Sequence, residues 1–247
     1  MYHSITFGDK NTWDNWRLIP TSRPVFNPPS PKVHMVDSGG LDGVIDLTRS
    51  LTGYTLYSNR TGSFEFYVTN GFKDWAVLYS EIANYLHGAS MKAILEDDPM
   101  YYYEGLFAVN QWKSEKDRSK IVIDYNVYPY KMEDQDSFGN WKWDPFNFRT
   151  GVIRNYKNIR IGTAKSVGEV TFNIRKNEKP TVPEFIVKLD KEDTNFEIQW
   201  TSSNRVYTVT KSGTYRYPRM VLPPRANNYI RFKGQGTVTI NYQGGSL

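Results

Sequence analysis

The sequence contains no cysteine, which excludes disulfide bonds, cysteine-ligated metal sites and thiol nucleophiles. Histidine is nearly as scarce, since His3, His34 and His87 are the only three and lie far apart in the chain. No H-E-x-x-H, G-x-S-x-G, G-x-x-x-x-G-K-[ST] or G-x-G-x-x-G pattern occurs. These are the short motifs of zinc, nucleophile and phosphate sites. We therefore expect no catalytic residues, no metal site and no bound cofactor.

Long hydrophobic runs are also missing. No window approaches the roughly 18–20 apolar residues that a membrane helix needs. The first residues, MYHSITFGDKNTW, show neither the basic start nor the apolar stretch of a secretory signal. We therefore expect a protein that does not insert into a membrane and that folds in a reducing cytoplasm.

Aromatic residues, by contrast, are abundant at 15% of the 247 residues, with 18 Tyr, 13 Phe and 7 Trp. Aromatic and β-branched residues favour strands, and aromatic residues are enriched where proteins contact one another. The length suits one large domain or two of ordinary size. The sequence thus predicts a mainly β protein.

The charge is distributed unevenly along the chain. Residues 1–145 hold 14 Lys and Arg against 19 Asp and Glu, whereas residues 146–247 hold 17 against 7. This change predicts two domains, an N-terminal domain at 1–132 and a C-terminal domain at 150–247, joined by a linker at 133–149. The basic second domain either faces an acidic polymer or protein surface, or is a soluble basic domain without such a partner.

A proline-rich segment follows the first short strand candidates, Ile5–Phe7 and Trp16–Ile19. Proline resists the interior of helices and sheets. We therefore expect an extended segment that either contacts a neighbouring subunit or lies as a loop on its own domain. The residues of interest are Pro20, Pro24, Phe26, Pro28, Pro29 and Pro31.

Regular elements are indicated by periodicity. Apolar residues at helical spacing, with Gly88 just beyond them, predict one helix at about 74–87. Ser63–Val68 alternates as a strand does. The C-terminal domain shows further short strand patterns, which predict a β-sandwich. These are Glu169–Ile174, Phe185–Leu189, Glu197–Trp200, Val206–Val209, Tyr229–Phe232 and Thr237–Tyr242.

Acidic residues cluster at Glu96–Asp98, just before the aromatic run Tyr101–Tyr103. We interpret the acids as a turn between two strands, because Asp side chains bond to turn backbone. The alternative is a glycosidase that uses Glu96 and Glu104. That chemistry requires two carboxylates facing one cleft about 5–10 Å apart, and a turn and a strand give no reason for it.

Two weaker patterns lie near the predicted linker. Asp134, Asp136 and Gly139 fit three positions of a calcium loop, but Phe138 and Pro145 replace residues that must bind the ion. Trp141 and Trp143, like Trp200 further on, either form a platform for a sugar or partner, or pack inside the protein.

The order of these features resembles the distal tail protein of siphophages and related prophages over essentially the whole chain. The resemblance rests on MYHSITFGDKNTWDNWRLIPTSRP at the start, a single helix leading to LHG, and then MKAILEDDPMYYYEGLFAV and IVIDYNVYPYK. WDPFNFRTGVI and YRYPRMVLPPRANNYIRFKGQGTVTINYQGGSL follow.

The resemblance implies a virion structural protein of the tail tip, assembled in the bacterial cytoplasm. It implies an N-terminal belt domain that closes six copies into a ring between the tail tube protein and the tail-tip hub protein. Two such rings can also stack back to back. DNA passes through the lumen of the ring without specific binding. The C-terminal domain would be a galectin-like sandwich that carries receptor-binding or peripheral tail proteins.

Sugar binding is not carried over by this resemblance. The galectin site uses a His, an Asn-Pro-Arg stretch and a Trp followed by Glu, whereas here no NPR occurs and Trp200 precedes TSS. A carbohydrate-binding or adhesion module that contacts the host cell wall through the C-terminal sandwich remains the alternative function.

Overall fold

The computed structural model describes residues 2–69, 75–114, 119–133, 157–174 and 177–247. By its internal contacts the chain divides into unit 1, residues 1–134 with residue 247, and unit 2, residues 135–246. The predicted linker at 133–149 lies almost wholly outside the described residues. Both units are built mainly of strands, as the sequence predicts.

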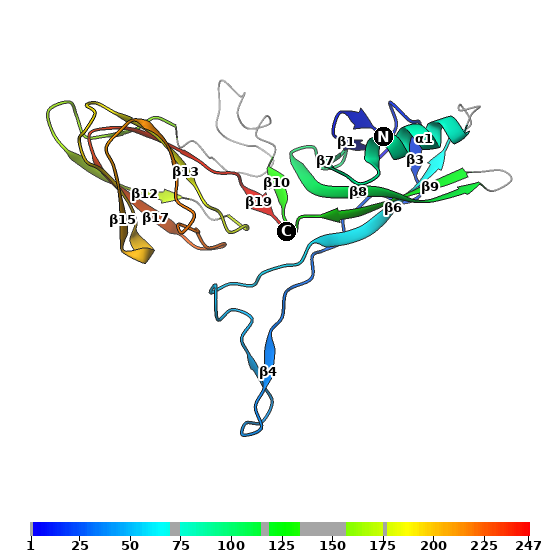
Figure 1. The fold of residues 1–247 in the computed structure, drawn as a ribbon, viewed down its shortest axis with the longest axis horizontal. Coiled ribbons are helices and arrows are strands. Elements are labelled where there is room, and N and C mark those ends of the chain that lie inside the picture. The colour runs from blue at the N-terminus through cyan, green and yellow to red at the C-terminus, as the bar shows by residue number, and fades with distance from the viewer. Residues whose placement is uncertain (1, 70–74, 115–118, 134–156, 175–176) are drawn as a thin grey trace. The chain divides into compact units, whose positions relative to one another are not determined.

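Unit 1 is organised around an antiparallel sheet with the strand order β2-β1-β7-β8-β9-β6-β3, and β10 pairs with β8 (Figure 1). The longest stretches of strand pairing are in the centre of the sheet, where β9 pairs with β8 on one side and with β6 on the other. The strands of unit 1 are β1 (Ile5–Phe7), β2 (Lys10–Asn11), β3 (Leu18–Pro20), β4 (Met35–Asp37), β5 (Val44–Asp46), β6 (Arg60–Val68), β7 (Ala89–Leu95), β8 (Tyr101–Ser114), β9 (Ser119–Val127) and β10 (Lys131–Glu133).

The alternation of apolar residues accounts for the sheet. In β9 the side chains of Ile121, Ile123, Tyr125 and Val127 are all buried, and the residues between them are more exposed. Successive strand residues point to opposite faces, so this pattern places one face of β9 in the core. The predicted strand at 63–68 is likewise confirmed inside β6, which pairs with β9.

One helix, α1 (Trp75–Leu86), covers the core face of the sheet, as predicted for residues 74–87. Leu78, Ile82 and Leu86 lie four residues apart and are buried in the same hydrophobic cluster as Phe107 of β8. Gly88 ends the helix with a φ of +77°, which a glycine adopts without steric cost. The predicted cap, Asp74, lies outside the described residues.

The N-terminal strand boundaries differ from the prediction. The strand expected at Trp16–Ile19 is β3 at Leu18–Pro20, and Trp16 is instead fully buried in the core. Pro20 pairs with Phe66 at the edge of the sheet, where a residue without an N–H is tolerated. Further along the chain, β8 continues to Ser114 and β9 begins at Ser119.

Unit 2 is a sandwich of two antiparallel four-stranded sheets, β11-β18-β13-β16 and β12-β17-β14-β15. Phe185 of one sheet meets Phe232 of the other with ring centroids 5.9 Å apart in a shared hydrophobic core. The strands and the one 3-10 turn are β11 (Ile159–Ile161), β12 (Gly168–Ile174), β13 (Glu184–Leu189), β14 (Phe196–Trp200), η1 (Thr201–Ser203), β15 (Arg205–Val209), β16 (Gly213–Arg216), β17 (Asn228–Gly234), β18 (Gly236–Asn241) and β19 (Gly245–Ser246).

The six strands predicted for this half of the chain are all present, and their ends differ from the predicted ends by at most two residues. Three short strands, β11, β16 and β19, were not predicted, because two to four residues are too few to show a period. The predicted sandwich is therefore confirmed.

Candidate assembly surface

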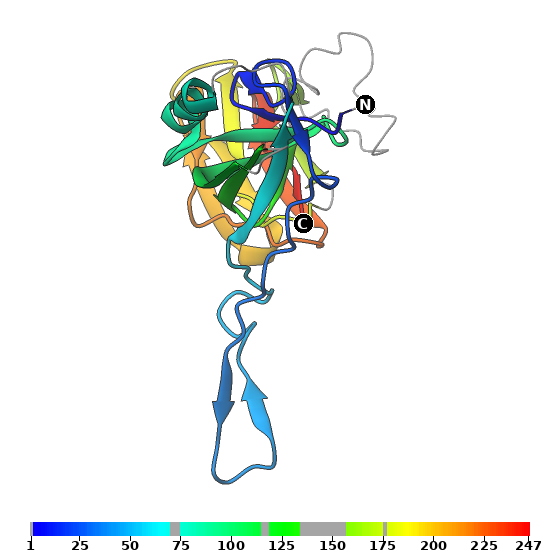
Figure 2. The same cartoon turned by 90° about the vertical axis from the view of Figure 1, so that its right-hand side faces the viewer.

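A two-stranded hairpin extends away from the sheet of unit 1, and we call residues 31–57 the arm (Figures 1 and 2). Its ribbon consists of β4 and β5, which pair in the register Met35 with Asp46, Val36 with Ile45 and Asp37 with Val44. This ribbon forms a sheet of its own, separate from the main sheet of unit 1.

The residues between and beside these strands explain the hairpin. The loop between them includes Gly43 with a φ of +80°, a backbone conformation that favours glycine. Beyond β5 the amide of Leu47 donates to the carbonyl of His34 over 2.9 Å. At the base, Lys32 donates to Leu56 over 2.8 Å, and Ser58 donates to Ser30 over 2.9 Å. The two ends of the arm therefore lie side by side where they join the rest of unit 1.

The arm is rich in exposed apolar side chains. Half of the large hydrophobic side chains that are exposed among the described residues belong to it. Leu51 is 97% exposed and Leu41 61%. The full set is Val33, Met35, Val36, Leu41, Val44, Ile45, Leu47, Leu51 and Leu56.

A shallow concavity of about 560 Å³ lies along one side of the arm. It runs from the segment Pro31–Met35 to the turn at Thr48–Ser50 and is lined by both apolar and polar groups. Its lining residues are Pro31, Val33, Met35, Asp46, Thr48, Arg49, Ser50 and Thr55.

These properties are typical of a surface that another chain covers. An isolated two-stranded ribbon is marginal in water at best, because it has no core to stabilise it. Contiguous exposed apolar surface on a soluble chain marks an interaction site. Unpaired strand edges add backbone donors and acceptors to which another chain can bind. The arm is therefore the candidate functional site of this chain.

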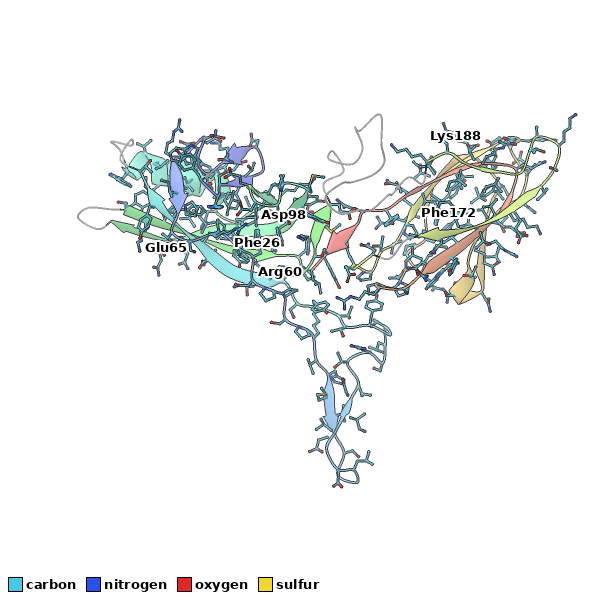
Figure 3. The ribbon with its side chains drawn as sticks, turned by 180° about the vertical axis from the view of Figure 1, so that it is seen from behind. Phe26, Arg60, Glu65, Asp98, Phe172 and Lys188 are labelled. Atoms are coloured by element: carbon cyan, nitrogen blue, oxygen red, sulfur yellow. The ribbon has the colours of Figure 1, made fainter. Side chains whose placement is uncertain are left out.

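The root of the arm is fixed by Phe26, which is 3% exposed and lies in the core of unit 1 (Figure 3). Its ring stacks on Tyr103 at 3.9 Å and meets Tyr125 edge-on at 4.7 Å. The next residue, Asn27, donates its amide to the hydroxyl of Tyr125 over 2.9 Å. The chain is thus held against the sheet a few residues before the arm begins.

Arg60 fixes the root of the arm on its other side, where the chain returns to the sheet in β6 (Figure 3). It is 4% exposed, and its guanidinium donates to the carbonyls of Asn27 and Pro129 over 2.9 and 2.8 Å. It also lies over the ring of Tyr103 at 5.5 Å. Burial lowers the pKa of Arg60, and the neighbouring Tyr103 and Tyr125 act in the opposite direction.

We expect Arg60→Met to lower the free energy of unfolding of unit 1 by about 2–4 kcal/mol, because two carbonyl acceptors lose their donor. Arg23→Met is the matched control, since Arg23 is an exposed arginine whose ion pair with Asp97 contributes at most about 1 kcal/mol. Urea unfolding of both variants measures the difference. Equal losses would contradict the structural role of Arg60.

The acidic turn at 96–98 is occupied by structural contacts. Glu96 accepts from the amide of Ser4 over 2.8 Å, and Asp97 accepts from Arg23 and His3 over 2.8 and 3.0 Å. Asp98 forms an ion pair with Lys131 at 2.6 Å. Desolvation raises the pKa of Asp97, but the hydrogen bonds from Arg23 and His3 outweigh it and hold that pKa below its usual value.

Other predicted residues are placed as follows. In the single chain Pro24 and Pro29 are buried with Phe26, whereas Pro28 and Pro31 are exposed and Pro20 is partly exposed. Trp200 packs partly buried against the core of unit 2, and its indole Nε1 is buried without a hydrogen-bond partner among the described residues. Trp141 and Trp143 lie outside the described residues. A glycan or partner contact at the tryptophans stays a prediction, as does a subunit contact of Pro20–Pro31.

No group of three or more His, Asp or Glu side chains is placed to hold a metal ion in the part of the chain that the structure describes. Within the same residues no helix is long and apolar enough to cross a membrane.

Comparison with known proteins finds a similarity in structure and none in sequence. No protein-family model matches the chain, and no curated protein matches its sequence. Among solved structures the chain is similar to the crystal structure of the Dit protein of phage SPP1, described as a paradigm of the hub adsorption apparatus in phages that infect Gram-positive bacteria. The match covers 100% of both chains with 13% sequence identity and a TM-score of 0.58. The two chains therefore share a fold from end to end.

Proposed function

We propose that this chain is a structural component of the tail tip of a siphovirus-like phage or prophage. The arm carries this proposal, because it exposes apolar side chains and strand edges that have no partner within the described chain. The similarity in fold to a hub protein over the full length supports the same function. A structural role needs no catalysis, and Glu96, one of the two acids of the glycosidase alternative, accepts a hydrogen bond from the amide of Ser4 in the turn.

In this proposal six copies form a ring between the tail tube protein and the tail-tip hub protein. A ring needs two different complementary patches on each copy, so that rotation closes the assembly. The arm supplies one patch and a surface of the next copy supplies the other. Receptor-binding or peripheral tail proteins attach outside, and DNA passes through the lumen. The protein assembles in the bacterial cytoplasm and resides at the virion tail tip.

We expect the purified chain to have six times its 28.7 kDa mass by light scattering, or twice that for two rings back to back. Negative-stain images of the same sample should show rings with an open centre. A chain that stays monomeric at high concentration, and also when mixed with its tail tube and hub partners, would contradict the proposal.

A second candidate function is contact with the host cell wall through the sandwich at 150–247. One observation favours it, an open polar pocket on unit 2. This function does not exclude the first, because the arm and the pocket belong to different units.

A further inference from the structure

The pocket on unit 2 has a volume of about 370 Å³, which is within the range of small-molecule sites. Three strands of one sheet, β13, β16 and β18, each contribute one polar side chain to it. The segment before β13 and the residues after β18 complete the wall. The lining residues are Lys179, Pro180, Thr181, Val182, Glu184, Arg216, Asn241, Tyr242 and Gln243.

The base of the pocket is rigid because it is tied to the sandwich by hydrogen bonds. Thr181 is 8% exposed and exchanges two backbone hydrogen bonds with Leu222, of 3.1 and 2.8 Å. Its hydroxyl accepts from the amide of Asn177 over 2.8 Å, and Asn177 accepts from the backbone of Gly245 over 3.0 Å. The pocket therefore exists before any ligand binds, which lowers the entropic cost of binding.

The polar wall of the pocket carries charges of both signs, at positions that the pairing of the strands fixes. Glu184 of β13 lies directly between Arg216 of β16 and Asn241 of β18 in the sheet register. The amide of Asn241 donates to the Glu184 carboxylate over 3.2 Å. Lys179 adds a second cation to the lining, so the wall holds two cations and one acid.

This order selects a ligand with two kinds of group. A bare phosphate offers Glu184 only a second negative charge, and a neutral sugar brings no anion to Arg216. A ligand that carries an anion and free hydroxyls suits all of them. The anion pairs with arginine in a bidentate manner, hydroxyls donate to the carboxylate, and the side-chain amides serve either partner.

We propose that this pocket binds an anionic saccharide or polyol unit, with a carboxylate or a phosphate beside free hydroxyls. Tyr242, which packs partly buried against the core of unit 2 and lines the pocket, supplies an aromatic surface against which the carbon skeleton packs. The proposal rests on the second candidate function, wall contact through unit 2, and is independent of ring formation.

The test uses the full chain and three probes, which are an oligogalacturonate, a poly(glycerol phosphate) and neutral dextran. Isothermal titration calorimetry should detect binding of at least one anionic probe and no binding of dextran at the same concentration. Arg216→Gln should weaken that binding by at least about tenfold, because the bidentate contact to the anion is lost. The anionic probe that binds tells carboxylate from phosphate as the source.

Lys188→Gln is the matched control. Lys188 is an exposed cation on the same strand and face as Glu184 but is not among the lining residues of the pocket, so its loss should change affinity less than about twofold. Equal weakening by both variants would show diffuse charge attraction and overturn the proposal. Failure of both anionic probes, or equal binding of dextran, would also overturn it. Light scattering of Arg216→Gln should match the wild type, so a failure here is distinct from a failure of the ring.

Discussion

Removal of the arm is expected to give a folded chain that no longer assembles. In this variant residues 32–57 are replaced by two glycines, which can close the gap because Ser58 already donates to Ser30 over 2.9 Å. Among the described residues, the two buried hydrophobic clusters contain no residue of the arm. The deletion should therefore shift the melting temperature by only a few degrees, while light scattering gives the mass of a single chain.

The size of this effect follows from the apolar surface that the arm presents. Burial of one Val, Leu, Ile or Met side chain contributes about 1.5–3 kcal/mol, and each 1.4 kcal/mol changes an association constant tenfold. Several of the nine exposed apolar side chains would be covered in a ring. The loss of their contribution is large enough to abolish assembly at micromolar concentrations, even after the cost of ordering the arm.

Two point variants separate the apolar contact from the mere presence of the arm. Leu51→Ser removes a side chain that is 97% exposed and should weaken assembly without changing the fold. Val167→Ser removes an exposed valine of unit 2 and should leave assembly unchanged. Intact rings from the arm deletion would contradict the assembly role of the arm directly.

The arm is also the element that the sequence predicted least well. Its strands contain apolar residues such as Val36 and Ile45, and periodicity assigns such residues to a core. Local sequence does not distinguish a residue buried in its own domain from one that awaits another chain. The strands of the sandwich could be predicted because their apolar residues meet a core within the same unit.

Contacts between residues that are distant in sequence are the second feature that could not be predicted. Phe26 lies in a proline-rich segment that resembles a surface loop, yet it packs against Tyr103 and Tyr125, which are distant in sequence. The pocket of unit 2 has the same origin, because strand pairing brings Glu184, Arg216 and Asn241 together. By contrast, the turn at 96–98 was predicted correctly, although its acidic side chains bond to residues distant in sequence rather than to the turn backbone.

Phe26→Ala is expected to cause the largest loss of stability of any single substitution near the arm. The ring is 3% exposed and contacts three aromatic neighbours, Phe64 among them at 5.0 Å. Truncation of a buried phenylalanine to alanine costs about 3–5 kcal/mol, through lost transfer free energy and the cavity left behind. Since a domain is stable by about 5–15 kcal/mol, unit 1 should unfold at a much lower urea concentration.

The neighbouring Val25→Ala provides the control, because Val25 is 64% exposed and its loss should change the free energy of unfolding by less than about 0.5 kcal/mol. Phe26→Leu should fall between the two, since it keeps most of the apolar volume. A loss below about 1 kcal/mol for Phe26→Ala would mean that Phe26 leaves the core in solution. The segment Pro20–Pro31 would then be free to contact a neighbouring subunit, which is one of the two alternatives that its proline content leaves open, and the assembly surface would begin at Pro20 rather than at Pro31.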